Sequence, residues 1–151
     1  WMIGSGMKDL SVVIVLGLGA KRQKAKIERL IEGEHLKNYS LYSNVTEMAD
    51  LMCRARTAIT ASGRTVYELA ACLVETVCIC QNSRQLTHMF VSEINGIFNL
   101  GYHKDVRRED FINAVREKLS YKGLGSGYRL DFSESKKNVL RAIRNLTNNE
   151  I

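Results

Sequence analysis

The sequence predicts an α/β domain in which a mainly parallel sheet of about five strands lies between two layers of helices. Short apolar segments alternate with helical patterns along most of the chain. The segments are apolar at nearly every position, which is typical of parallel strands covered on both faces. A chain of 151 residues is long enough to bury one such core. We therefore expect one Rossmann-like three-layer domain over residues 10–151, preceded by a linker or cloning remnant at residues 1–9.

The strands are predicted from runs of β-branched and other apolar residues that end at turn residues. Such runs occupy residues 11–16, 39–42, 57–61, 76–80 and 97–100. Helical spacing of apolar residues predicts the intervening helices. These helices cover residues 20–31, 64–72 and 84–94, with another around residues 48–52. Two more helical patterns follow the last strand. The first is marked by Phe111, Ile112, Val115 and Leu119, and the second by Val139, Leu140, Ile143 and Leu146. The first helix is expected to turn Ile27, Leu30 and Ile31 inward, and residues 123–128 to form a linker turn.

Two of these helices begin with a capping-box pattern. Asn44 with Glu47, and Thr65 with Glu68, have the spacing at which an N-cap side chain and a carboxylate three residues later satisfy the first backbone N–H groups. At the second position the same residues also suit a ligand. Ser62 and Gly63 precede Thr65, and a glycine lets an anion approach the backbone closely. Capping and anion binding both remain open for this segment.

Ligands of parallel sheets bind beyond the carboxyl ends of the strands. The loops expected at that edge are residues 17–19, 43–44, 62–65, 81–85 and 101–103. In the first loop, Gly17 and Gly19 resemble the start of a dinucleotide fingerprint, but Arg22 stands where the third glycine belongs and no acidic residue ends the second strand. NAD is therefore rejected as a cofactor, although a phosphate contact at this turn stays open. Asn82 and Gln85 could bind sugar hydroxyls or belong to a solvated loop.

Composition excludes several classes of protein. The formal charge of +6 suits an anionic partner, but no Lys/Arg block with interleaved aromatic residues indicates nucleic-acid binding. No apolar run reaches the ~20 residues of a membrane span. Four cysteines without metal-binding spacing suggest buried, reduced thiols and a cytoplasmic protein, with no metal site.

The three histidines suggest no self-sufficient catalytic centre. His35 is expected at the surface and His88 to be packed or on a helix surface, while His103 lies in a loop at the binding edge. No serine–histidine–carboxylate order or paired carboxylates accompany them. The catalytic residues are therefore left unknown.

Residues 48–101 resemble the C-terminal domain of the UDP-sugar hydrolases of the pseudaminic acid pathway and their relatives in spore-coat polysaccharide and sialic-acid-type sugar biosynthesis. The peptidoglycan N-acetylglucosaminyltransferase is a more distant likeness. The resemblance is carried by a strand followed by Ala-x-Gly-x-Thr-x-x-Glu, which here is ASGRTVYE at residues 61–68. It implies the C-terminal half of a GT-B fold. The first loop, GLGAKRQ, departs from the family's Gly-Gly-Ser/Thr-Asp-like pattern.

The resemblance also implies roles for individual residues. Gly63, Arg64 and Thr65, together with Ser62, would lie at a diphosphate, and Glu68 would hold the ribose. The sugar would be approached by Asn82 or Gln85, and the phosphates by Gly17 and Gly19. The ligand would be UDP or a UDP-sugar, and no other cofactor is expected.

Two functions from different classes follow. The chain is expected to be the nucleotide-sugar-binding half of a hydrolase or glycosyltransferase whose N-terminal half is missing, and to be catalytically incompetent alone. Alternatively, it is a non-catalytic docking or oligomerisation module fused to a sugar-activating enzyme such as a cytidylyltransferase. A homodimer is compatible with either.

Overall fold

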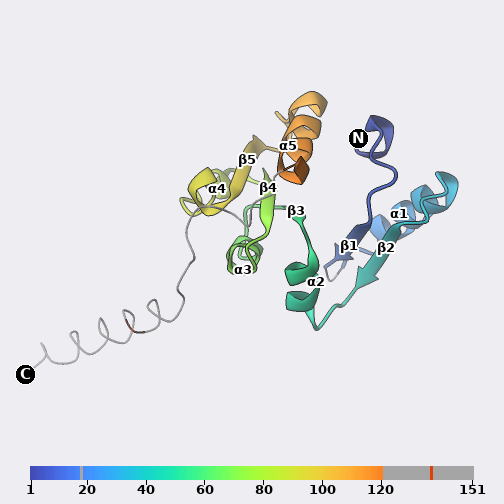
Figure 1. Ribbon diagram of the computed structural model, residues 1–151, viewed down its shortest axis with the longest axis horizontal. Helices are drawn as coiled ribbons and strands as arrows, with labels where there is room; N and C mark the ends of the chain where they lie inside the picture. Colours follow the sequence, from blue (N-terminus) through green and yellow to red (C-terminus); the bar gives the residue numbers. More distant parts are fainter. Residues whose placement is uncertain (18, 121–136, 138–151) are drawn as a thin grey trace, which may run out of the picture.

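The computed structural model describes residues 1–17, 19–120 and 137, and in it strands and helices alternate along the chain (Figure 1). The strands are β1 (Val12–Leu16), β2 (Tyr39–Ser43), β3 (Thr57–Thr60), β4 (Glu75–Cys80) and β5 (Ile97–Tyr102). The helices are α1 (Lys21–Gly33), α2 (Met48–Arg54), α3 (Thr65–Ala71), α4 (Ser83–Leu86) and α5 (Arg108–Ser120), with short 3-10 helices η1 (Ile3–Ser5) and η2 (Glu93–Asn95). The predicted α/β class is confirmed.

The parallel strands are divided between two sheets. β1 pairs with β2, and a separate three-stranded sheet has the order β3-β4-β5. In Figure 1 the first pair lies on the right with α1, and the second sheet lies on the left with α3, α4 and α5. The sequence predicted one sheet of about five strands. Strand patterns specify that a segment is extended, but they do not specify which neighbour it pairs with.

The core lies around β4, the central strand of the larger sheet. Val77 packs against α5 with Phe111 and Val115, whereas the next residue, Cys78, packs with Val66 of α3. Successive strand residues point to opposite faces, so α5 and α3 cover opposite faces of this strand. This explains why β4 is apolar at most positions, as expected for a covered parallel strand.

A third cluster joins α2 to α3. Met52, Leu69 and Val74 are buried together, and Met48, Ala55, Ala58 and Cys72 pack partly against them. In Figure 1, α2 lies between the two sheets in the chain path. The smaller sheet is less covered: Val13 of β1 is 48% exposed, and α1 contains no buried residue. Leu30, expected to face inward, is 48% exposed.

The N-terminal segment expected to be a linker contacts α5. Met7 is buried in the same cluster as Phe111. The guanidinium groups of Arg108 and Arg116 donate hydrogen bonds to the carbonyl oxygens of Gly4 at 3.1 Å and Ser5 at 3.0 Å. These contacts place the segment against the larger sheet's covering helix.

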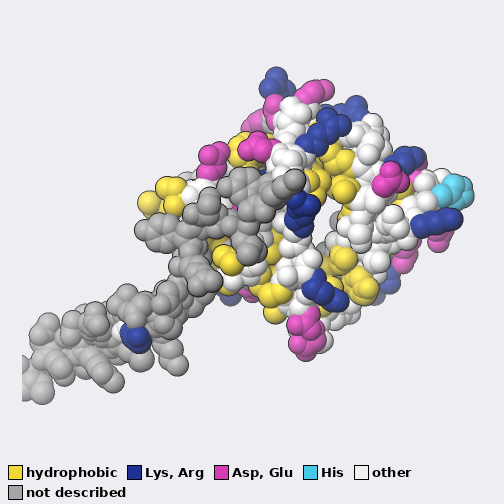
Figure 2. Space-filling model, in the orientation of Figure 1, with side chains coloured by type: hydrophobic (Ala, Val, Ile, Leu, Met, Phe, Trp, Pro, Cys, Tyr) yellow, Lys and Arg dark blue, Asp and Glu magenta, His cyan; other side chains and the backbone are white. Residues whose placement is uncertain are grey.

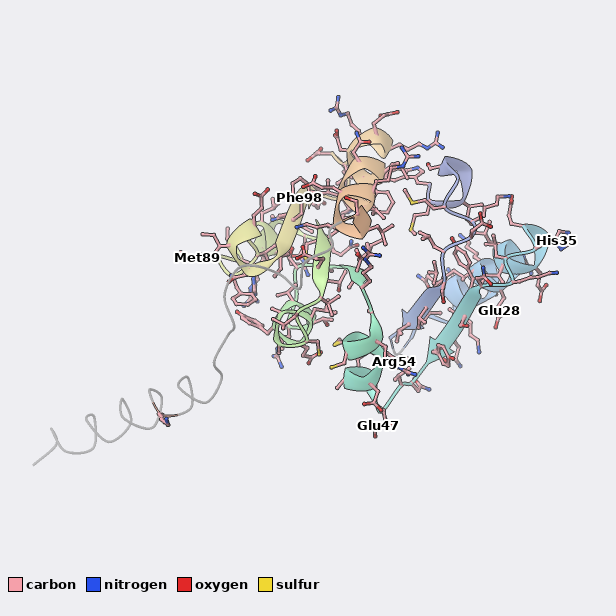
Figure 3. All side chains as sticks on the ribbon, viewed as in Figure 1. Glu28, His35, Glu47, Arg54, Met89 and Phe98 are labelled. Carbon is pink, nitrogen blue, oxygen red and sulfur yellow. The ribbon has the colours of Figure 1, made fainter. Side chains whose placement is uncertain are left out.

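The helix expected over residues 84–94 is wrong in extent. Only α4 is α-helical, and η2 forms a separate 3-10 turn before β5. The chain leaves the helical path between them, which carries Val91 into the cluster with Val66, Cys78 and Ile97. Met89 is left 96% exposed, and Figure 3 shows it beyond α4 at the outer edge of this part of the molecule.

Both predicted capping boxes are wrong. Asn44 has a φ of 56°, in the left-handed region, and belongs to the turn after β2; α2 begins at Met48 without a side-chain cap. At α3 the N-cap position is Arg64, and neither Thr65 nor Glu68 forms a cap hydrogen bond. α2 begins later along the chain than the pattern requires and α3 begins one residue earlier, so neither Asn44 nor Thr65 occupies the N-cap position.

Two further expectations concern the C-terminal part and the cysteines. The helix marked by Val139 to Leu146 and the turn at residues 123–128 lie outside the described residues. The cysteines are only partly buried, contrary to the prediction: Cys78 and Cys80 are fully buried, but Cys53 is exposed and Cys72 is half-buried. Small apolar-like thiols occur at helix surfaces as well as in cores, and the sequence does not separate the two.

Candidate functional site

The carboxyl ends of β3, β4 and β5 meet at one edge of the larger sheet, because the three strands are parallel. Side chains join them there. The Ser62 hydroxyl lies 3.2 Å from Cys80 Sγ, and the Cys80 thiol donates to Asn99 Oδ1 at 3.5 Å. Asn99 Oδ1 also accepts from the Gly101 backbone N–H at 2.9 Å. One polar chain thus connects the loop after β3 to β4 and β5.

The loop after β3 is a tight turn built on Ser62. This side chain is 1% exposed, and the N–H of Gly63 donates to the carbonyl of Ala61 at 2.7 Å. Burial of the hydroxyl against Cys80 holds the turn down on the sheet. The next residues, up to Thr65 at the start of α3, are partly or fully exposed.

Gly63 leaves open space beside this turn. A Cβ built on Gly63 would meet no atom within 4 Å, and its φ is not positive, so the fold itself does not require glycine here. The backbone N–H groups of Arg64 and Thr65 have no acceptor among the described residues. Adjacent open N–H groups of this kind can bind an anion.

Glu68 lies in the first turn of α3 and is exposed. Within the described part of the chain its carboxylate has no hydrogen bond or ion pair. The guanidinium of Arg64 is also exposed. The turn therefore offers backbone donors, a cation and a carboxylate with no described partner within one helical turn.

Asn82 and Gln85 are engaged with their own loop. Asn82 Oδ1 accepts from the Gln85 N–H at 3.2 Å and caps α4, and Gln85 Oε1 accepts from the Gln81 N–H at 2.7 Å. Both side chains follow β4 at the same sheet edge as Ser62. The side-chain oxygens hold the loop, and neither amide nitrogen donates a hydrogen bond to another described residue.

The first glycine turn belongs to the other sheet. Gly17 and Gly19 follow β1, both are exposed, and Gly19 has a φ of 89° that favours glycine. No hydrogen bond or ion pair among the described residues joins this turn to Ser62 or Glu68. Three of the five expected loops therefore share one sheet edge, and the loops after β1 and β2 share another.

The three histidines lie in different environments, and His35 is at the surface as expected. His35 is exposed at the end of α1 (Figure 3). His88 packs on the Tyr67 ring, with ring centroids 5.4 Å apart. The backbone N–H of His103 donates to the carbonyl of Cys80 at 2.9 Å, so its loop is tied to the sheet edge. Within the described part of the chain, no ion pair joins any of the three histidines to a carboxylate.

Sequence reasoning missed Cys80 and Asn99 as parts of this site. A polar asparagine inside the apolar run IFNLGY was the signal that could have revealed the connection. The neighbouring Cys78 thiol is not a nucleophile. Burial raises the pKa of Cys78 to about 11, which keeps that thiol protonated at neutral pH.

The described residues show neither a metal site nor a membrane-spanning helix. They contain no group of three or more histidine, cysteine or acidic side chains that could hold a metal ion, and no helix long and apolar enough to cross a bilayer. Figure 2 shows basic and acidic side chains intermixed on the face in view, without one broad basic surface. No protein-family model, curated protein or solved structure matches this chain.

Proposed function

We propose that this chain is the C-terminal nucleotide-sugar-binding domain of a GT-B-type hydrolase or glycosyltransferase. Its pathway would be bacterial surface-polysaccharide or nonulosonic (sialic-type) acid biosynthesis, in the cytoplasm. The resemblance of residues 61–68 to the family motif is the reason for naming this class. The observation that supports it most is the turn at Ser62 to Thr65, where a buried hydroxyl anchors a backbone that is open at Gly63.

The proposed ligand is UDP or a UDP-sugar. Its diphosphate would accept hydrogen bonds from the N–H groups of Arg64 and Thr65 and pair with the Arg64 guanidinium. The Glu68 carboxylate would accept from the ribose hydroxyls, one helical turn away. The side-chain amides of Asn82 and Gln85 would approach the sugar from the loop after β4.

Catalysis would require groups from a second half-domain across a cleft. Rate enhancement depends on holding the reacting atoms and the catalytic group in a fixed geometry. This domain would bind the donor nucleotide and leave the chemistry to its partner half. The chain alone is therefore proposed to bind nucleotide weakly and to turn over no substrate.

The test is calorimetric binding of UDP to the chain and to the double variant Thr65→Ala, Glu68→Ala. The proposal expects binding to the unchanged chain and at least a tenfold loss in the variant, with an unchanged circular dichroism spectrum. A matched control replaces Thr46 and Glu47, an exposed threonine and glutamate in another loop, and should bind normally. Intact affinity in a folded Thr65/Glu68 variant would refute the proposal.

A docking or oligomerisation module remains the second candidate, because the loop around α4 exposes large apolar side chains. Met89 is 96% exposed, Ile94 67% and Leu86 47%. A large contiguous apolar patch marks an interaction surface, and this candidate requires these three side chains to form one. Analytical ultracentrifugation distinguishes the candidates: this one expects an oligomer that Met89→Lys with Ile94→Lys dissociates, and a monomer at all concentrations would count against a self-association module.

A further inference from the structure

Two thiols from different elements meet at the surface, away from the sheet edge. Cys53 in α2 and Cys72 at the C-cap of α3 have their sulfur atoms 3.0 Å apart, within hydrogen-bond distance. Cys53 is exposed and Cys72 is half-buried. Neither helix capping nor the proposed nucleotide site accounts for this pair.

The packing beneath the thiols holds them in place. Met52 precedes Cys53 and is buried with Leu69 and Val74, and Cys72 itself packs against that cluster. The two helices are thus held together independently of the sulfur atoms. A disulfide needs an S–S distance of about 2.05 Å, so closing the bond requires a sulfur displacement of about 1 Å. Side-chain rotation is expected to supply a movement of that size without disrupting the cluster.

We propose that Cys53 and Cys72 form a redox-modification site, a dithiol that low-molecular-weight disulfides such as oxidised glutathione convert into an intramolecular disulfide. The site would be reduced in an ordinary cytoplasmic environment and oxidised under disulfide stress. Its product would be a covalent link between α2 and the C-terminal end of α3.

The reaction proceeds in two exchanges. The Cys53 thiolate attacks one sulfur of oxidised glutathione, the glutathione S–S bond breaks, and one glutathione leaves as a thiolate that takes up a proton. Cys72 then loses its proton to water and attacks the Cys53 sulfur of the mixed disulfide, which expels the second glutathione. Two protein thiols are oxidised to one disulfide, and one glutathione disulfide is reduced to two thiols.

The structure also sets the order of attack. Cys53 is the more accessible sulfur. The hydrogen bond with Cys53, together with burial, raises the pKa of Cys72 to about 11, so Cys72 holds its proton more tightly than an ordinary thiol. Cys53 is thus the attacking residue and Cys72 the resolving residue.

The test exposes the reduced, full chain to oxidised glutathione at about pH 8, near the pKa of an ordinary cysteine. After acid quench, the remaining thiols are alkylated and the protein is analysed by intact-mass and peptide mass spectrometry. We expect a loss of two hydrogen atoms and a cross-linked peptide pair joined through Cys53 and Cys72. Dithiothreitol should reverse both changes.

Single variants distinguish the two roles. Cys72→Ser should accumulate a stable glutathione adduct on Cys53, because no resolving thiol is present. Cys53→Ser should form no Cys53–Cys72 cross-link, and it should form a glutathione adduct more slowly than Cys72→Ser does. Circular dichroism checks that both variants are folded. The proposal would be overturned if the unchanged chain gave only the mixed disulfide, gave no oxidation, or gave a cross-link that involved Cys78 or Cys80.

Discussion

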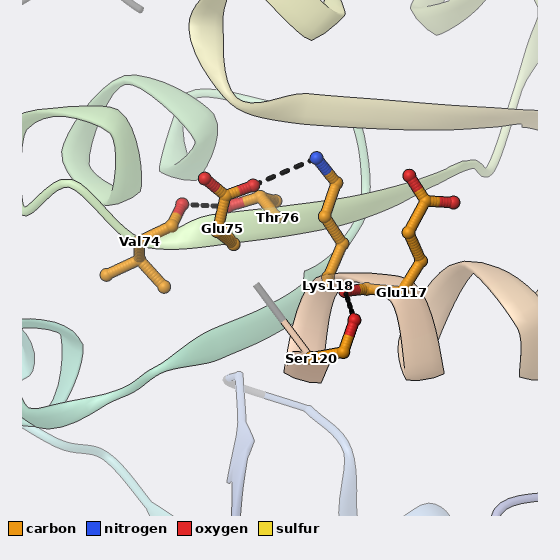
Figure 4. A network of polar contacts seen from close by, with 6 residues as sticks. All are labelled: Val74, Glu75, Thr76, Glu117, Lys118 and Ser120. Carbon is orange, nitrogen blue, oxygen red and sulfur yellow. Dashed lines mark hydrogen bonds and ion pairs between the residues drawn. The ribbon is translucent and has the colours of Figure 1, made fainter. Parts of the chain in front are cut away.

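Lys118 Nζ lies 2.9 Å from Glu75 Oε2, and this ion pair joins the last turn of α5 to the first residue of β4 (Figure 4). The two side chains are only 13% and 8% exposed. In the same region the hydroxyl of Thr76 donates to the carbonyl of Val74 at 2.9 Å. The pair anchors the covering helix at the edge of the sheet opposite the candidate site.

Removing one partner of this pair should destabilise the domain. Lys118→Met would leave the Glu75 carboxylate buried without its cation, at an expected loss of about 3 kcal/mol in the free energy of unfolding. Urea denaturation measures it. The matched control is Arg107→Met in the exposed pair with Asp110, which should change the stability far less. Equal losses in the two variants would contradict the assignment of Lys118 as a buried anchor.

The Arg107–Asp110 pair gives a pH prediction. The hydrogen bond from Arg107 holds the pKa of Asp110 below its usual value. A group whose pKa is lowered by folding contributes stability above its unfolded pKa and loses that contribution as the pH falls through the folded pKa. Carboxyl NMR titration should show an Asp110 pKa below 3.8 that rises in Arg107→Ala. An unchanged value in the variant would show that the guanidinium is not the cause.

Ser62→Ala should loosen the turn at the candidate site. The change removes a fully buried hydroxyl and leaves the Cys80 thiol with Asn99 as its remaining partner. The expected cost is about 1 kcal/mol, as for a typical intramolecular hydrogen bond. Thermal unfolding measures the cost, and backbone amide exchange near Gly63 should become faster. Exchange as slow as in the unchanged chain would mean that Ser62 does not hold the turn.

Gly63→Ala should separate folding from binding. Because a Cβ at Gly63 meets no atom and the φ is not positive, stability should stay within about 0.5 kcal/mol of the unchanged chain. A nucleotide phosphate that approaches the backbone closely would be displaced by the new methyl group, so UDP affinity should fall severalfold. Gly33→Ala, which also has open space at the end of α1, is the control. Unchanged UDP affinity in Gly63→Ala would show that the phosphate does not bind at this turn.

The positions of the strands could be predicted from the sequence, but their pairing and the extent of one helix could not. Runs rich in β-branched and other apolar residues, ended by turn residues, located β1 to β5 within one or two residues. Burial explains the apolar run at β4, whereas β1 and β2 contain no buried residue. The division into two sheets could not be predicted, since pairing depends on contacts distant in sequence. The helix over residues 84–94 failed for a related reason: Val91 is drawn into the core, which outweighs helical spacing.

The sequence predicted where the segments of the candidate site lie along the chain, but not which of them contact one another. The ASGRT segment was located correctly after a strand and before a helix, because glycine and hydroxyl residues mark such turns. Its three-dimensional support was not predictable. Asn99 is 37 residues from Ser62 in sequence, and only the folded sheet connects them through Cys80. The two capping boxes illustrate the opposite error, since local spacing suggested bonds that the tertiary structure does not form.

The most direct test of the central claim is an NMR titration of the purified chain with UDP, with CMP and ADP as controls. A nucleotide site at the turn after β3 predicts amide shifts at Gly63 to Glu68, with smaller ones at Gln81 to Gln85, and larger shifts for UDP than for the other nucleotides. Such a pattern would assign a uridine nucleotide to the turn after β3. No shifts at millimolar nucleotide would contradict a nucleotide-binding domain and favour the docking module.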